Sequence, residues 1–115
     1  MTTERIYKIC AAAEWRAAEK AGEFTGSAVD IADGFIHFST ADQLAETARK
    51  HFSGQSGLVL VTVETGLVRG ELKWEPSRGG ALFPHLYTAL NLDAATAVQP
   101  MPLGSDGAPM LPDTL

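Results

Sequence analysis

The chain has 115 residues, enough for one domain of common size, with 45% hydrophobic and 20% charged residues as in ordinary globular proteins. Its formal net charge of −5 arises from 14 acidic and 9 basic residues, and the basic residues form no run. Binding to a nucleic-acid polymer depends on clustered cations, so this class of function is excluded. A single nucleotide needs only one or two local cations and remains compatible with the composition.

Cellular location and covalent cross-links are constrained by what the sequence lacks. The N-terminus has no basic stretch followed by an apolar run, and no apolar stretch reaches the roughly 18 residues of a membrane-spanning helix. We therefore expect a cytoplasmic protein that does not enter membranes. Cys10 is the single cysteine, which excludes a disulfide framework, and its neighbours predict a buried, unreactive thiol.

The first third of the chain contains signals for two strands and a helix. β-forming residues with loose alternation predict a strand over Arg5–Cys10. Helical spacing of apolar residues predicts a helix over Ala11–Ala21, which Gly22 ends. Mixed glycine, serine and aspartate indicate a surface loop over Glu23–Asp33, and a short strand is predicted at Phe35–Ser39.

A second helix is the best-specified element, because one apolar stripe runs through residues 41–52. Thr40 with Gln43, or Ser39 with Asp42, forms the capping pattern that begins it. His51 lies in the last turn, where the helix dipole favours a cation, so we interpret this residue as structural.

The middle of the chain predicts two further strands. Gly57–Glu64 is apolar on both faces for most of its length, which is typical of a central strand. Glu71–Glu75 alternates polar and apolar residues, which predicts that Leu72 and Trp74 face the core. Pro76–Gly80 breaks regular structure and predicts a flexible, accessible loop.

The last part of the chain completes the expected architecture. Closing strands are predicted over Leu86–Leu92 and Ala94–Val98. The prolines and glycines from Pro100 onward predict a loosely ordered tail. We therefore expect a single domain over residues 1–115, with its folded part at about 5–98 and the tail at 99–115. Two early helices followed by several strands indicate an α+β fold with small mixed or antiparallel sheets.

Three short blocks combine histidine, arginine or glutamate with aromatic residues, the mixture expected of a ligand pocket with apolar walls. They read GFIHFST at 34–40, KWEPSRGG at 73–80 and FPHLY at 83–87. In the first block, strand alternation places Phe35, His37 and Ser39 on one face, beside the N-terminus of the second helix. A phosphate or ribose contact there is consistent with the anion affinity of helix N-termini. A structural role, in which Ser39 or Thr40 caps the helix and His37 bonds within the fold, stays open.

In the second block, Glu75 ends a strand at the mouth of a glycine-rich loop. Beside Trp74, the pKa of the Glu75 carboxyl is expected to be raised, as suits a general base or a ribose contact. Arg78 is the best-placed cation for a phosphate or carboxylate. The alternative is a surface ion pair of Glu75 with Arg78 or Lys73, which contributes about 0–1 kcal/mol.

In the third block, Phe83, His85 and Tyr87 share one face if the segment is extended, and Pro84 predicts a strand end or an edge. A ring nitrogen of His85 and the Tyr87 hydroxyl suit recognition of a small ligand. A structural Tyr–His hydrogen bond under an aromatic cluster is equally consistent.

Other chemistries find little support in the sequence. The histidines lack metal-ligand spacing, so no metal site is predicted, and zinc would require His37, His85 and Glu75 to converge. Motifs of serine hydrolases, Walker-type nucleotidases and Rossmann domains are absent from the sequence.

The ordered set RIYKI at 5–9, Trp15, GFIHFS at 34–39, LKWE at 72–75 and FPHLY at 83–87 resembles the bacterial domain-of-unknown-function 952 family. The resemblance covers roughly residues 5–98 and implies a compact α+β fold similar to that of ADP-ribosyltransferases. It implies no established activity. ADP-ribosyltransferases and the related RNA 2′-phosphotransferases bind NAD or an ADP-ribosyl intermediate in a cleft between two small sheets, so NAD is the ligand that the resemblance implies.

The resemblance also suggests positions for functional groups. Tyr7 and Lys8 occupy the region where those transferases carry a His or Arg on the first strand. The segment at 34–39 is similar to the one that carries an aromatic or His followed by Ser. Glu75 could correspond to the transferases' acidic residue.

Together these observations predict a cleft that binds a nucleotide or another phosphorylated ligand. Its expected lining is Tyr7, Lys8, His37, Ser39, Glu75, Arg78, His85 and Tyr87, with Glu75 or His37 as the general base. Two alternatives remain open: a non-enzymatic module that recognises a protein partner or metabolite, and a purely structural polar–aromatic core. The oligomeric state is not predicted.

Overall fold

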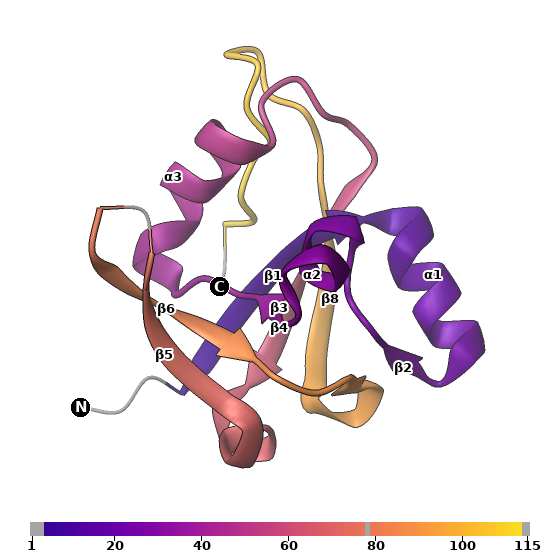
Figure 1. The fold of residues 1–115 in the computed structure, drawn as a ribbon. Helices are drawn as coiled ribbons and strands as arrows, with labels where there is room; N and C mark the ends of the chain where they lie inside the picture. Colours follow the sequence, from indigo (N-terminus) through magenta and orange to yellow (C-terminus); the bar gives the residue numbers. More distant parts are fainter. Residues whose placement is uncertain (1–3, 78, 114–115) are drawn as a thin grey trace.

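The computed structural model describes residues 4–77 and 79–113, which fold into two small antiparallel sheets, a two-stranded ribbon and helices (Figure 1). The first sheet has the order β1-β4-β8, formed by β1 (Arg5–Ala11), β4 (Leu58–Glu64) and β8 (Ala95–Met101). The second has the order β3-β6-β5, formed by β3 (Ile36–His37), β6 (Ala81–Leu86) and β5 (Leu72–Ser77). The ribbon pairs β2 (Glu23–Phe24) with β7 (Leu90–Asn91).

The helices among these residues are α1 (Ala12–Ala21), α2 (Ala28–Asp33) and α3 (Ala41–His51), and short 3-10 turns lie at Thr65–Leu67, Arg69–Glu71 and Leu92–Ala94. The expected α+β class with small antiparallel sheets is therefore confirmed. The expectation of two early helices is wrong, because α2 is a third. None of the helices in the described part combines the length and apolar character needed to cross a membrane.

The elements with strong local signals lie where the sequence predicts them. β1, α1 and α3 match their predicted ranges to within one residue at each end. Gly22 ends α1 with a φ of 90°, and its N–H donates to the Ala18 carbonyl at 2.8 Å. The apolar strand β4 is central, as expected, since β1 and β8 flank it and both of its faces are covered.

The loop predicted at Glu23–Asp33 is wrong, because the segment contains β2 and α2. The cause is the spacing Ser27-x-x-Asp30. The Asp30 carboxylate accepts a hydrogen bond from the Ser27 N–H at 2.8 Å, as in a capping box that begins a helix. Asp30 is 1% exposed, so a residue expected at the surface lies in the interior.

The predicted loop at Pro76–Gly80 is also corrected, because β5 continues through Pro76 to Ser77. β5 is an edge strand, where a proline removes no hydrogen bond that a neighbour requires. Trp74 was expected to face the core but is 39% exposed on the edge strand β5, although its cross-strand partner Pro84 in the central strand is fully buried. Arg78 lies outside the described residues.

The strand predicted at Leu86–Leu92 begins and ends earlier, at Ala81 and Leu86, with β7 as a separate short strand. Pro84 therefore lies within the central strand β6 and not at a strand end or edge. Its carbonyl accepts from the Phe38 N–H at 3.0 Å, just past the last residue pair of β3. The missing N–H of Pro84 thus falls where the short partner strand has ended.

Two apolar clusters lie on opposite faces of the first sheet, as strand alternation requires. On one face, Ile6 and Val63 pack with α1, β2 and the second sheet. On the other, Ile9 and Leu60 pack with α3. The first sheet is thus sandwiched between α3 and the rest of the molecule (Figure 1).

The segment after residue 98 is more ordered than the predicted tail. β8 continues to Met101, which is 1% exposed and belongs to the cluster beneath α3. The chain then turns back, and Leu103 forms a bridge with Pro109. The Gly54 N–H donates to the Gly107 carbonyl at 2.7 Å, which ties this segment to the loop after α3. Burial of Met101 and these main-chain bonds explain the correction.

Candidate functional site

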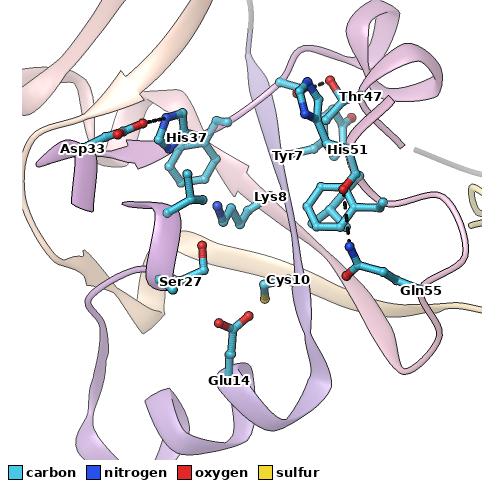
Figure 2. A pocket seen from close by; sticks show the side chains of 16 residues that line it. Tyr7, Lys8, Cys10, Glu14, Ser27, Asp33, His37, Thr47, His51 and Gln55 are labelled. Carbon is cyan, nitrogen blue, oxygen red and sulfur yellow. Dashed lines mark hydrogen bonds and ion pairs between the residues drawn. The ribbon is translucent and has the colours of Figure 1, made fainter. Parts of the chain in front are cut away.

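A cleft of about 550 Å³ follows the outer edge of β1, a volume typical of small-molecule sites (Figure 2). β1 contributes residues 7–10 to its lining. Further walls come from the first turn of α1, from both ends of α2, from residues 37–39 and from the last turns of α3 with the loop that follows. The cleft therefore lies between elements that are far apart in the sequence.

The main chain of β1 forms the floor of the cleft. Tyr7 exchanges two hydrogen bonds with Ser39: the Tyr7 N–H donates to the Ser39 carbonyl at 2.8 Å, and the Ser39 N–H donates to the Tyr7 carbonyl at 2.9 Å. Because hydrogen-bonding groups alternate in an antiparallel strand, the N–H and C=O of Ile9 point outward on the same side. No described residue pairs with them, and Ile9 lines the cleft. A ligand can thus meet one donor and one acceptor of the main chain here.

Behind this edge lies a buried ionic network centred on Asp30. The Lys8 ammonium, 4% exposed as a residue, contacts both Asp30 carboxylate oxygens, at 2.8 and 3.0 Å. The Ser27 hydroxyl donates to the same carboxylate at 3.0 Å, and so does the main-chain N–H of His37 at 3.1 Å. The network fixes Lys8 in one wall of the cleft.

The pKa of Asp30 reflects two opposing effects. Burial of the carboxyl raises its pKa, but the hydrogen bond from His37 and the charge of Lys8 outweigh burial. The net result is that the pKa of Asp30 lies well below its usual range. Asp30 is therefore ionised at neutral pH and balances the buried ammonium.

His37 uses both of its ring nitrogens within this network. Its Nδ1 lies 2.7 Å from Asp30 Oδ1, and its Nε2 lies 2.9 Å from Asp33 Oδ2. The sequence suggested that His37 would act beside the N-terminus of α3, but the ring pairs with carboxylates of α2. Both contacts are hydrogen bonds when the ring carries both protons, which leaves no lone pair for a general base.

On the other side of β1, the cleft wall is made of hydroxyl, amide and imidazole groups. The hydroxyls of Ser39 and Thr47 lie 3.1 Å apart, and both residues are buried. His51 and Gln55 line the cleft beside them, although the sequence indicated only a structural role for His51. Gln43 caps the first turn of α3 by accepting from the Thr40 N–H at 3.0 Å.

The second and third blocks form a separate cluster next to the cleft. The carboxylate atom Glu75 Oε1 lies 2.8 Å from His85 Nδ1 and accepts from the Tyr87 hydroxyl at 2.7 Å. Hydrogen bonds from Tyr87 and then His85 lower the pKa of Glu75, contrary to the expected increase beside Trp74. The hydrogen bond between Tyr87 and Glu75 also raises the pKa of Tyr87.

Phe35 joins this cluster to the cleft. Its ring stacks on His85 with centroids 4.2 Å apart and lies 4.6 Å from the ring of His37. His37 and His85 are direct partners in the β3–β6 pair. The three blocks therefore lie next to one another, but in two adjoining groups and not in the single cleft that was expected.

The predicted site residues are distributed between these groups. Tyr7, Lys8, His37 and Ser39 line the cleft. Glu75, His85 and Tyr87 are not among its lining residues and form the cluster behind Phe35. Arg78 lies outside the described residues.

Sequence reasoning missed Asp30 and Glu14, although each had a signal. Ser27-x-x-Asp30 is a capping pattern, and a carboxylate in that position belongs to a helix start and not to a loop. Glu14 has the same relation to Ala11, whose N–H donates to Glu14 Oε1 at 3.0 Å. Both carboxylates lie where a helix begins at the edge of the cleft.

Cys10 lines the cleft, yet we expect it to react slowly with thiol reagents. It is 1% exposed, and burial raises the pKa of its thiol to about 12, so little thiolate exists at neutral pH. Labelling with a disulfide reagent at pH 8 should be at least about tenfold slower than for the same thiol in urea. Equal rates in the two conditions would contradict this expectation.

Comparisons with known proteins find a matching family and similar solved structures. The model of the family described as protein of unknown function (DUF952) matches residues 9–98. A crystal structure of protein CC0527 from Caulobacter crescentus is similar, with 53% identity, a TM-score of 0.90 and coverage of 93% of this chain and 94% of that chain. A solution NMR structure of CC0527 has 53% identity, a TM-score of 0.85 and 96% coverage of both chains. No functionally curated protein matches the chain.

Proposed function

The chain belongs to the DUF952 family of proteins of unknown function, and from that premise we propose that it binds a nucleotide or related phosphorylated small molecule in the cleft along β1. NAD and ADP-ribose are examples of this ligand class. A relationship of the fold to that of ADP-ribosyltransferases is part of the same proposal. It is supported by the position of the cleft beside the first strand.

The observation that carries the proposal is the outward N–H and C=O of Ile9 on the floor of the cleft. Burying main-chain groups without partners costs about 1–3 kcal/mol each, so a ligand that satisfies both gains affinity. Nucleobases and carboxamides carry an adjacent donor and acceptor that match such a pair. The side walls supply further polar groups at Lys8, Ser39 and Thr47.

The shape of the site favours a small ligand over a protein partner. The polar groups surround a concave volume of about 550 Å³, whereas a protein interface is usually flatter. His37 acts in this proposal as a positioning residue for Asp30 and Lys8, because its two nitrogens already contact carboxylates. A role for Glu75, His85 or Tyr87 requires a ligand that extends from His37 across Phe35.

Calorimetric titration with NAD, ADP-ribose and nucleoside monophosphates tests this function. We expect saturable binding of at least one of them to the wild-type protein. Ser39→Ala removes a cleft hydroxyl and should weaken that binding about three- to tenfold, the usual effect of one hydrogen bond.

The matched control is Ser105→Ala, which changes an exposed serine that does not line the cleft and should leave affinity unchanged. No heat from any of these ligands, with folded protein at high concentration, would overturn the proposed function.

A further inference from the structure

We propose that the edge of β1 divides the cleft into two lobes of different charge, and that the ligand places an N–H-donating or cationic group in one and its phosphate in the other. The ligand class is then a nucleotide whose base carries an amino group, such as an adenine or cytosine nucleotide. This ligand class rests on the proposed function and narrows the range of nucleotides that the cleft would bind.

The division follows from strand alternation. Lys8 and Cys10 point to one face of β1, and Tyr7 and Ile9 point to the other. Figure 2 shows Lys8, Ser27 and Glu14 together on one side of the strand, with His51 and Gln55 on the other. The main-chain groups of Ile9 lie between the two lobes.

The first lobe carries more negative than positive charge. Its lining carboxylates are Glu14 and Asp33 and its basic groups are Lys8 and His37, while the buried Asp30 carboxylate lies directly behind Lys8 and His37 and adds its charge. The lobe is therefore net negative whether or not His37 is protonated. Because Asp30 already contacts the Lys8 ammonium through both oxygens, Lys8 offers little unbalanced charge to an anion. A phosphate in this lobe would face uncompensated carboxylates.

Glu14 and Asp33 are the acceptors in this lobe that a ligand can reach, and Asp33 already contacts His37 through Oδ2. The Oε1 atom of Glu14 accepts from the Ala11 N–H, and no described residue pairs with its Oε2 atom. The residue is half-buried and lines the cleft, so its charge is only partly screened by water. A carboxylate oxygen accepts and never donates, so it favours an amino group over a carbonyl in the same position.

The second lobe favours a phosphate group. Its polar lining residues are Tyr7, Ser39, Thr47, His51 and Gln55, and no carboxylate occurs among the described residues that line this side. Hydroxyl, amide and imidazole groups donate hydrogen bonds to phosphate oxygens without like-charge repulsion. A nucleotide bound across the strand edge thus has its base near Glu14 and its phosphate near His51.

Adenosine monophosphate and inosine monophosphate test this assignment. They differ chiefly at one ring position, where the first carries an amino group and the second a carbonyl. We expect the wild-type protein to bind adenosine monophosphate at least about tenfold more tightly, as a charge-assisted hydrogen bond implies. Glu14→Gln keeps the oxygen that caps α1 and should remove most of this preference. His51→Asn should weaken both nucleotides alike.

The matched control is Glu19→Gln, an exposed carboxylate on the same helix, which should leave both affinities unchanged. Equal binding of the two nucleotides by the wild-type protein, or an unchanged preference in Glu14→Gln, would overturn the two-lobe assignment while the proposed function stands. Absence of binding by both nucleotides, NAD and ADP-ribose would overturn the proposed function and this assignment with it.

Discussion

Replacing Asp30 by alanine should lower the free energy of unfolding by about 3–5 kcal/mol, the usual cost of leaving one partner of a buried ion pair without the other. The variant leaves the Lys8 ammonium buried at 4% exposure with no carboxylate in contact. It also removes the acceptor for the Ser27 N–H and for the His37 ring. Urea denaturation followed by circular dichroism measures the change.

Asp33→Ala is the matched control for this variant. Asp33 lies on the same helix and also contacts His37, but its side chain is 47% exposed, so its removal should cost less than about 1 kcal/mol. If Asp30→Ala cost no more than Asp33→Ala, the buried network would not be the source of stability. Combining Asp30→Leu with Lys8→Met should recover much of the loss, because no charge is then left buried.

Asp30 should also determine part of the acid sensitivity of the protein. Its pKa is lowered in the folded state relative to the reference value of 3.8 for the unfolded chain. The unfolded state therefore binds the proton more readily, and the stabilisation is complete at neutral pH. It is lost progressively as the pH falls below about 4. Unfolding free energies between pH 7 and pH 3 should decline less steeply in Asp30→Asn than in the wild-type protein.

Gly26→Ala should destabilise the protein by about 2–4 kcal/mol, from backbone strain and steric overlap together. Gly26 has a φ of +113°, which L-residues rarely adopt. An added Cβ would lie 2.7 Å from the Cβ of Asp30, an atom close to the backbone that cannot rotate away. Relief would require α2 to shift and would move Asp30 from Lys8.

Gly22→Ala separates the two contributions. Gly22 also has a positive φ, of +90°, but an added Cβ there meets nothing within 4 Å. Only the backbone strain of about 1–2 kcal/mol is expected at this position. Thermal and urea unfolding of both variants should show the larger loss for Gly26→Ala, and the reverse order would contradict the proposed overlap with Asp30.

Elements with a complete local signal could be predicted from the sequence. The apolar stripe of α3 and the two-sided apolar character of β4 each lie within one short window, so their positions follow from periodicity alone. α2 has six residues and one capping pattern, and its identity depends on Asp30 being buried by partners far away in the sequence. That dependence on tertiary contacts explains why the segment resembled a loop.

The candidate site could likewise be predicted only in part from the sequence. Alternation correctly predicted that His85 and Tyr87 share a face, and both contact Glu75. It could not show that the cleft would open at the edge of β1 and leave Glu75 behind Phe35. This outcome depends on how the two sheets pack against each other, which no short stretch of sequence encodes.

The proline within β8 has a consequence for how molecules of this protein meet in solution. β8 is the outer strand of its sheet and contains no charged residue, which would normally invite a strand from another molecule. Pro100 pairs with Val59 of β4, and the main-chain groups of Val59 bond to β1 on its other side. Because hydrogen-bonding directions alternate, the nitrogen of Pro100, which carries no hydrogen, faces outward from the sheet. A register shift beside Thr62 interrupts the same edge at its other end. An approaching strand would therefore find too few successive hydrogen-bonding groups, which protects the folded protein from aggregating through this edge at high concentration.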